Sequence, residues 1–266
     1  MGLLGIFREF CGYGDYQREP AGAYSWQHLT LVAVVLTAMV VLAVYFGLKN
    51  KNKDLAQKNR VLVWSAILID AFEMFKIIVM ITRSDEPETA WHNLLPLFLC
   101  SIQLITIPLA AFTKGRIKRA SLDFVLIFGI LGAVLGTVGA AQNYANYPVL
   151  SMDNVVSAIT HSISGFASLY IAISGMTSLK KRDLPITYGI LAFFCVAAYS
   201  VNKVLDTNYM FLMSDDGTPY SLLTALVKGN STLYAFGVIF LFVIYIAVFY
   251  LTHTLVVRNK KKKAQA

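Results

Sequence analysis

Charged residues are scarce in this sequence. Asp, Glu, Lys and Arg make up 14% of its 266 residues, whereas soluble domains usually carry about 25%. Hydrophobic residues account for 57% of the chain, and the mean hydropathy is +0.61. This composition is typical of an integral membrane protein, in which helices satisfy the backbone hydrogen bonds that lipid cannot. We therefore expect an all-α, polytopic membrane fold.

The sequence also has few of the residues and patterns on which soluble enzymes depend. Its three cysteines are Cys11, Cys100 and Cys195, and the last two lie in apolar runs, which argues against a disulfide framework. It has no nucleotide-binding glycine pattern and no GxSxG nucleophile elbow. The four histidines lack metal-ligand spacing. The last apolar run has no lysine for a retinal. We expect neither a metal nor a cofactor.

Seven apolar runs are present, each near the ~20 residues that cross a bilayer. They are Ser25–Leu48, Arg60–Thr82, Trp91–Phe112, Ala120–Ala141, Val155–Leu179, Pro185–Leu205 and Ser231–Val257. The sequence therefore predicts a bundle of seven membrane-spanning helices. In the third run, Pro96 would kink the helix four residues before Cys100.

The net charge of +8 does not predict a nucleic-acid partner, because the basic residues lie in short loops and a tail. The first, third and fifth loops and the tail are basic, and the second is acidic. By the positive-inside rule, the basic segments are cytoplasmic, the N-terminus is outside and the C-terminus is cytoplasmic. We expect a multi-pass plasma membrane protein.

This topology divides the chain into three parts. Residues 1–24 form a short extracytoplasmic segment, with an interfacial helix expected over Leu3–Phe10. Residues 25–257 form the membrane domain, and residues 258–266 form a basic cytoplasmic tail.

Polar side chains from several runs reach similar depths in the outer leaflet. With a rise of ~1.5 Å per residue, Cys100 and Glu73 lie roughly 13 Å from the outer surface and His161 roughly 9 Å. Asn202 and His28 lie near the outer ends of their runs. A charged residue at this depth needs a partner or a water-filled cavity.

Each of these residues also has a purely structural interpretation. Cys100 would be a small buried hydrophobe. His161 would bond a neighbouring helix, and His28 would be an anchoring group. Lys76 would neutralise Glu73 within one helix.

Taken together, these polar residues favour a catalytic site over a purely structural role. A cysteine becomes a nucleophile when a base takes its proton, and that base is oriented by a third polar group. Cys100 and His161 have the required identities. Glu73 or Asn202 would orient the imidazole.

Several motifs resemble the YwaF-type integral membrane proteins of bacteria, which are related to a eukaryotic family of multispanning phospholipid acyltransferases. Leu95–Cys100, LPLFLC, is similar to the LPLHLC of that family. His28-Leu29, Glu73 and His161 fit its pattern. Asn202, followed by Asn208 in TNYMFL, is similar to its N…NYMFL signature. The resemblance implies cysteine-dependent acyl transfer between membrane lipids. The family's histidine is replaced here by Phe98, which moves the role of base to His161.

We therefore predict an acyl-lipid transferase with Cys100 and His161 as catalytic residues, supported by a polar layer of His28, Glu73, Asn202 and Asn208. Membrane lipids would be its substrates. One alternative is a transporter or small-ligand carrier that uses Glu73, Lys76 and Asn202. Another is a receptor or assembly partner in which the polar groups only join helices.

Overall fold

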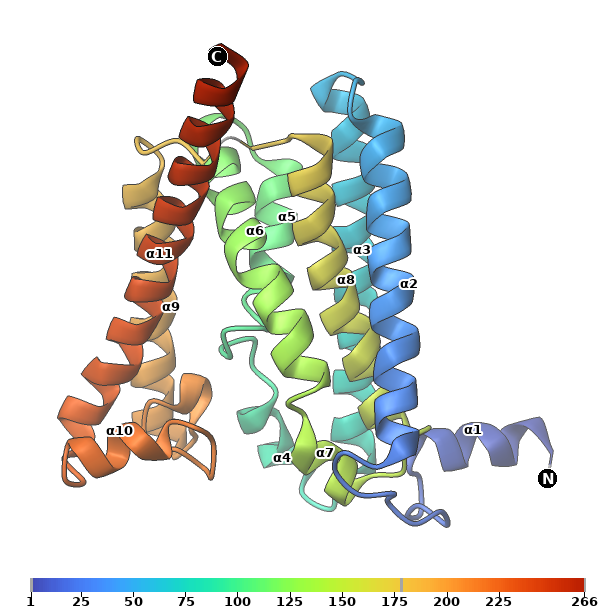
Figure 1. The fold of residues 1–266 in the computed structure, drawn as a ribbon. Coiled ribbons are helices and arrows are strands. Elements are labelled where there is room, and N and C mark those ends of the chain that lie inside the picture. Colours follow the sequence, from blue (N-terminus) through green and yellow to red (C-terminus); the bar gives the residue numbers. More distant parts are fainter. Residues whose placement is uncertain (1, 178, 266) are drawn as a thin grey trace. The chain divides into compact units, whose positions relative to one another are not determined.

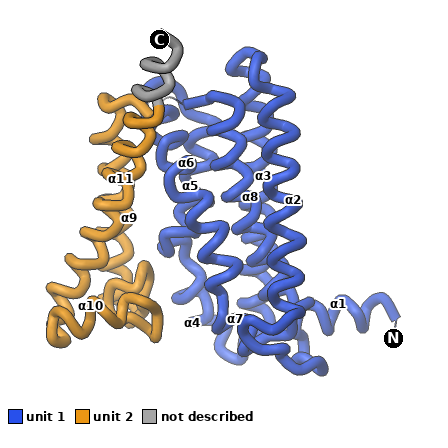
Figure 2. The backbone as a smooth tube through the Cα atoms, in the orientation of Figure 1, with its two compact units in different colours: residues 1–177 blue, residues 178–266 orange. Residues whose placement is uncertain are grey.

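The computed structural model describes the backbone of residues 2–177 and 179–265, and the side chains as far as residue 256. Throughout these residues the regular elements are all helices, as Figure 1 shows, which confirms the all-α prediction. The side chains of the predicted basic tail, 258–266, lie outside the described residues. The chain divides into two compact units, residues 1–177 and 178–266 (Figure 2).

Five helical segments are long and apolar enough to cross a membrane: Trp26–Asn50, Gly115–Asn146, Met152–Ser174, Leu184–Leu205 and Ser231–Val256. The second of these consists of a long helix, Gly115–Thr137, and a short one, Ala141–Asn146. The five segments correspond to five of the seven predicted runs. The second run forms a helix of 29 residues, α3 (Leu55–Arg83), whose apolar stretch also carries Asp70, Glu73 and Lys76.

The third predicted run, Trp91–Phe112, is not one helix, so that prediction was wrong. A short helix α4 (Pro87–Ala90) and a 3-10 turn η1 (Trp91–Asn93) come first, and residues 94–102 have no regular helix before α5 (Gln103–Phe112). Pro96 lies in this irregular segment and therefore kinks no helix. Proline removes a backbone donor and disfavours helical geometry in the residue before it, here Leu95.

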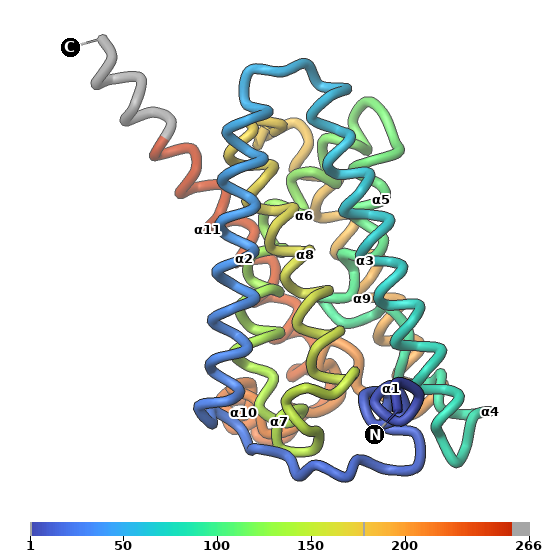
Figure 3. Tube along the Cα trace, turned by 90° about the vertical axis from the view of Figure 1, so that its right-hand side faces the viewer, coloured from blue at the N-terminus to red at the C-terminus, as the bar shows by residue number. Residues whose placement is uncertain are grey.

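The first unit is built around α8 (Met152–Ser174). This helix packs against α2 (Trp26–Asn50), α3 and α6 (Gly115–Thr137), and Figure 3 shows these helices side by side in a second view. Ser151 caps α8 by accepting a hydrogen bond from the Asn154 N–H at 3.3 Å. Gly175 ends it in the left-handed conformation, with φ of 71°. The ends of α8 are therefore set by local sequence.

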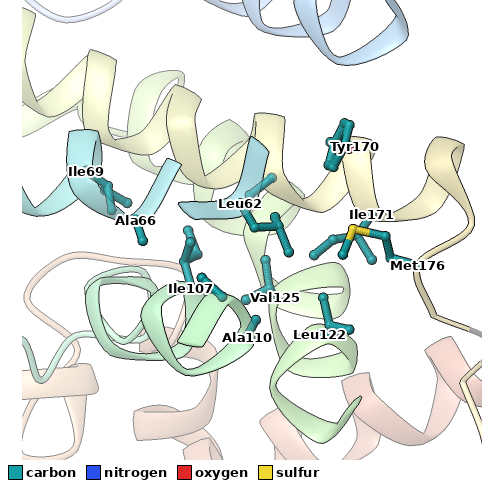
Figure 4. Packing of buried hydrophobic residues seen from close by; sticks show 12 residues of the cluster. Leu62, Ala66, Ile69, Ile107, Ala110, Leu122, Val125, Tyr170, Ile171 and Met176 are labelled. Atoms are coloured by element: carbon teal, nitrogen blue, oxygen red, sulfur yellow. The ribbon is translucent and has the colours of Figure 1, made fainter. Parts of the chain in front are cut away.

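The core of this unit gathers apolar side chains from α3, α5, α6 and α8 (Figure 4). Leu62, Ile107, Val125 and Ile171 are all completely buried within it. The short helix α7 (Ala141–Asn146) follows α6. The core fixes α5 against α3 and α6, and thereby the segment just before α5, which contains Cys100.

The N-terminal helix α1 (Leu3–Cys11) belongs to the same unit and agrees with the helix predicted over Leu3–Phe10. It runs across the axes of α2, α3 and α8 rather than along them (Figure 1). Leu3, Leu4 and Ile6 are exposed, whereas Cys11 is fully buried against the C-terminal end of α3 and the N-terminal end of α8.

The second unit contains α9 (Leu184–Leu205), a 3-10 turn η2 (Tyr209–Phe211), α10 (Ser221–Leu226) and α11 (Ser231–Gln265). Asn202 organises the turn that follows α9. Its amide donates to the Tyr209 carbonyl at 3.0 Å, and its oxygen accepts from the Tyr209 N–H at 2.7 Å.

Candidate functional site: a cysteine and a histidine in a small cavity

Cys100 lies in the turn immediately before α5, and His161 lies in the middle of α8. The two side chains are hydrogen-bonded to each other. The hydroxyl of Ser101 is also hydrogen-bonded to the Cys100 sulfur. Depth along separate apolar runs predicted similar levels for Cys100 and His161, and the structure brings the two side chains together.

The imidazole of His161 is held by its own helix. Its Nδ1 lies 2.7 Å from the Ser157 carbonyl oxygen, one turn earlier on α8. A carbonyl only accepts hydrogen bonds, so Nδ1 carries the proton and donates it. Nε2 is then left without a proton and accepts from the Cys100 thiol. We expected Glu73 or Asn202 to orient the imidazole, but its orienting partner is the backbone of Ser157.

Two glycines on α6, one turn apart, make room for this pair. A Cβ at Gly136 would lie 1.9 Å from Cδ2 and 2.1 Å from Nε2 of His161, far inside van der Waals contact. A Cβ at Gly132 would lie 3.5 Å from the Cys100 Cβ, an ordinary contact distance. Only glycine at position 136 allows the His161 ring to occupy its present place. Neither glycine was predicted from the sequence, although their spacing of four places them on one helix face.

Cys100 and His161 line a small cavity together with charged and hydroxyl side chains. The other lining residues are Ile69, Glu73, Lys76, Ser101, Leu104, Thr160 and Ser164. Lys76 Nζ lies 2.5 Å from Glu73 Oε1, and these side chains are 19% and 14% exposed. The helix pair that the structural interpretation expected is therefore present, and it lies in the same cavity as the thiol.

The cavity is far smaller than a lipid. Its volume of about 30 Å³ holds one or two water molecules, since a single water needs at least roughly 10–15 Å³ and takes up about 30 Å³ in the liquid. A much larger apolar groove of about 490 Å³ lies between α2, α3 and α8. The groove and the cavity have no lining residue in common. On α8, Ile159, Ile163 and Phe166 face the groove, while His161 and Ser164 point to the other side of the helix.

His28 is completely buried. Its Nδ1 accepts from the Tyr24 N–H at 3.0 Å, and its Nε2 lies 3.1 Å from the Thr137 carbonyl. The ring stacks on Tyr144 with centroids 3.7 Å apart. His28 joins the start of α2 to the end of α6 and does not line the cavity.

Asn202 and Asn208 belong to the second unit, where each organises a turn. Asn208 Nδ2 donates to Asp216 Oδ2 at 2.7 Å, and its Oδ1 accepts from the Met213 N–H at 2.9 Å. Neither asparagine lines the cavity.

A second polar cluster, which the sequence analysis missed, ties α1 and the following loop to α3 and α8. Arg83 forms two hydrogen bonds with Asp153, Nη1 to Oδ2 at 2.7 Å and Nη2 to Oδ1 at 2.5 Å. Arg83 also donates to the Cys11 carbonyl at 3.0 Å. The Tyr16 hydroxyl donates to Asp153 at 2.6 Å. Burial and the Asp153 carboxylate raise the pKa of Tyr16, which stays protonated.

No curated protein and no solved structure matches the chain. A sequence model of the TMEM164 family matches residues 23–250, which includes Cys100, His161 and every other residue that lines the cavity. The relation to the YwaF-type proteins and to the acyltransferases stays a prediction. The match covers most of the chain, and the helices are long and apolar, so the chain is a multi-pass membrane protein of the TMEM164 family.

Proposed function

We propose that this protein is a membrane-embedded acyl-lipid transferase that uses Cys100 as its nucleophile. The observation that carries the proposal is the hydrogen bond between Cys100 and His161, with the far nitrogen of His161 fixed on Ser157. A nucleophile, a base and a group that orients the base are the parts that covalent acyl transfer requires.

The reaction has two halves. His161 Nε2 takes the thiol proton while the Cys100 sulfur attacks the carbonyl carbon of an acyl ester, and the carbonyl electron pair moves onto oxygen. Collapse of this intermediate breaks the ester C–O bond, and the leaving alcohol takes the proton from His161. The products are a thioester on Cys100 and a lipid with one acyl chain fewer. The hydroxyl of a second lipid then attacks the thioester by the same steps and restores the thiol.

The position of Cys100 in the irregular segment just before α5 also supports the proposal. Irregular backbone at membrane depth is tolerated where it lines a cavity in the protein, and residues 94–102 reach the cavity at Cys100 and Ser101.

An acyl donor larger than the present cavity has to displace side chains around it. We propose that the donor enters from the outer leaflet between α3 and residues 94–102. Glu73 and Lys76 on α3 line that side of the cavity, as does Ser101. Membrane lipids are the substrates in this scheme, and the bilayer supplies them directly.

The proposal includes the full topology. The protein resides in the plasma membrane with seven spans, of which α3 is the second and residues 91–112 the third. The N-terminus is outside and the C-terminus is cytoplasmic, as the basic loops favour. Helix α1 then lies in the outer interface, and its exposed Leu3, Leu4 and Ile6 face the acyl chains.

The test is acyl transfer by the purified protein in liposomes that contain a phospholipid donor and a lysophospholipid acceptor. Cys100→Ser should lower turnover by about 10³-fold, because only binding and electrostatic contributions remain. Cys195→Ser is the matched control, since Cys195 is a buried thiol that contacts Met210 in the second unit. Turnover that survives Cys100→Ser would remove the nucleophile from the proposal.

One observation supports the alternative of a transporter: the Glu73–Lys76 ion pair lines a cavity with room for water. Intramembrane charges of this kind occur along ion and proton pathways. Uptake of a solute that requires Glu73 and is unchanged in Cys100→Ser would favour this alternative.

A further inference from the structure

We propose that Lys76 is the group that binds the oxyanion formed when Cys100 attacks an acyl ester. This inference rests on the proposed function and adds a catalytic residue to it. The proposal is based on the ammonium group of Lys76, which lines the same small cavity as the Cys100 thiol. Proton transfer between a thiol and a histidine does not by itself require such a group.

The charge on Lys76 is placed toward the cavity by the geometry of α3. Ile69, Glu73 and Lys76 are spaced by four and three residues, so they share one face of the helix, and all three line the cavity. A lysine within an apolar span is costly to insert unless it is paired or hydrated. The ion pair with Glu73 stabilises the buried ammonium group of Lys76 and holds it in place.

The pairing with Glu73 leaves Lys76 with donors to spare. An ammonium group has three N–H bonds, and in the described part of the chain Glu73 is the single ion-pair partner of Lys76. The remaining N–H groups are available to a negatively charged oxygen that appears in the cavity. Electrostatic stabilisation of such an oxygen is strongest in a site with little water, and this cavity admits only one or two water molecules.

The charges balance through the step. Before attack the cavity holds Glu73 and Lys76 as a neutral pair, and Cys100 and His161 share one proton and together carry no net charge. Proton transfer to His161 and attack by the sulfur create one imidazolium and one oxyanion. Lys76 donates a hydrogen bond to that oxyanion without giving up its proton, and the oxyanion disappears when the ester C–O bond breaks.

The test compares two reactions of Cys100 in the full-length protein in liposomes. The first is thioester formation, followed by intact mass, with either a diacylglycerophosphocholine or a diacylglycerol as donor. The second is alkylation by iodoacetamide, in which sulfur displaces iodide and no oxyanion forms. Lys76→Gln should slow thioester formation by about 100-fold with both donors, the loss typical for removal of one oxyanion donor. Alkylation should slow much less, and Lys76→Arg should restore part of the acylation rate.

Lys76→Gln alone leaves Glu73 unpaired and can prevent folding. The double variant Glu73→Gln/Lys76→Gln removes both charges together and should show the same selective loss of acylation. Lys49→Gln, at the exposed cytoplasmic end of α2 in the proposed topology, is the control for loss of a positive charge.

Three results would overturn the assignment of Lys76. They are wild-type acylation in the double variant, an equal loss of alkylation and acylation, and a loss confined to the phospholipid donor. The last would assign Lys76 to the phosphate group instead. Failure of the wild-type protein to form any thioester on Cys100 would refute the proposed function, and this inference with it.

Discussion

At the scale of single residues, the site depends on the close approach of α6 to α8 at Gly136. The imidazole of His161 occupies the space that any other side chain at this position would fill. The same ring is fixed at its other nitrogen by Ser157. The ring therefore faces Cys100 because Gly136 has no side chain and because the Ser157 carbonyl holds Nδ1, and not because Glu73 orients it.

Gly136→Ala is expected to displace the His161 ring, since the new Cβ would lie 1.9 Å from Cδ2. A displacement of about 1 Å costs on the order of 100-fold in rate when it separates a base from its nucleophile. Acyl transfer and alkylation of Cys100 should therefore both fall, because each depends on the base.

Gly132→Ala is the matched control on the same helix face. Its Cβ would lie 3.5 Å from the Cys100 Cβ, which requires no rearrangement, and both rates should stay near those of the wild type. Equal effects of the two substitutions would show that they act through helix packing rather than through His161.

At the scale of helices and loops, the sequence predicted most elements and missed the breaks between them. The apolar runs at α2, α6, α8, α9 and α11 each form a long regular helix. The run over Trp91–Phe112 has a similar composition but contains an irregular segment, residues 94–102. Hydropathy records only that such a segment is apolar and not whether it is helical.

Depth along each run predicted that Cys100 and His161 are at similar levels, but not that they touch. Contact depends on the path of the irregular residues 94–102 and on how α8 is rotated about its axis, and that rotation is set by the packing of α8 against α2, α3 and α6. For the same reason the sequence does not single out Ser157, Gly132 or Gly136. The Arg83–Asp153 pair was not predicted because the two residues lie 70 positions apart, one at the C-terminal end of α3 and the other in the first turn of α8.

The Arg83–Asp153 pair should stabilise the end of the first unit at which α3 ends and α8 begins. Asp153 is 4% exposed and Arg83 14%, and removal of one partner from a buried pair costs about 3 kcal/mol. Asp153→Asn should therefore lower the free energy of unfolding by about that amount, measured by denaturation in detergent. Arg83→Lys should cost less because it keeps the charge while losing the two-point contact.

Arg18→Gln is the control for this pair. Arg18 is 46% exposed where it contacts Glu9, and exposed ion pairs contribute little to stability. We expect its unfolding transition to match that of the wild type. A transition in Asp153→Asn that also matches the wild type would mean that the buried pair is not needed to hold this end together.

At the scale of the whole molecule, the number of spans depends on α3 and on residues 91–112. If both cross the membrane, the chain has seven spans and residues 84–90 are outside. If neither does, the five long apolar helices are the spans, and residues 84–90 lie on the same side as residues 51–54.

Epitope tags in these two loops separate the arrangements. We expect a tag at residues 84–90 to be accessible to antibody in intact cells, and a tag at residues 51–54 to be accessible only after permeabilisation. Protection of both tags in intact cells would contradict the seven-span topology.

The proposed acyl transfer depends on the formation of a thioester on Cys100. The direct measurement is the intact mass of the purified protein after incubation with a phospholipid of known acyl composition in liposomes. We predict a mass increase equal to one acyl group minus a hydrogen, located on Cys100, removed by hydroxylamine and absent in Cys100→Ser and His161→Asn. An unmodified wild-type protein that remains folded, or an acyl group located on another residue, would contradict it.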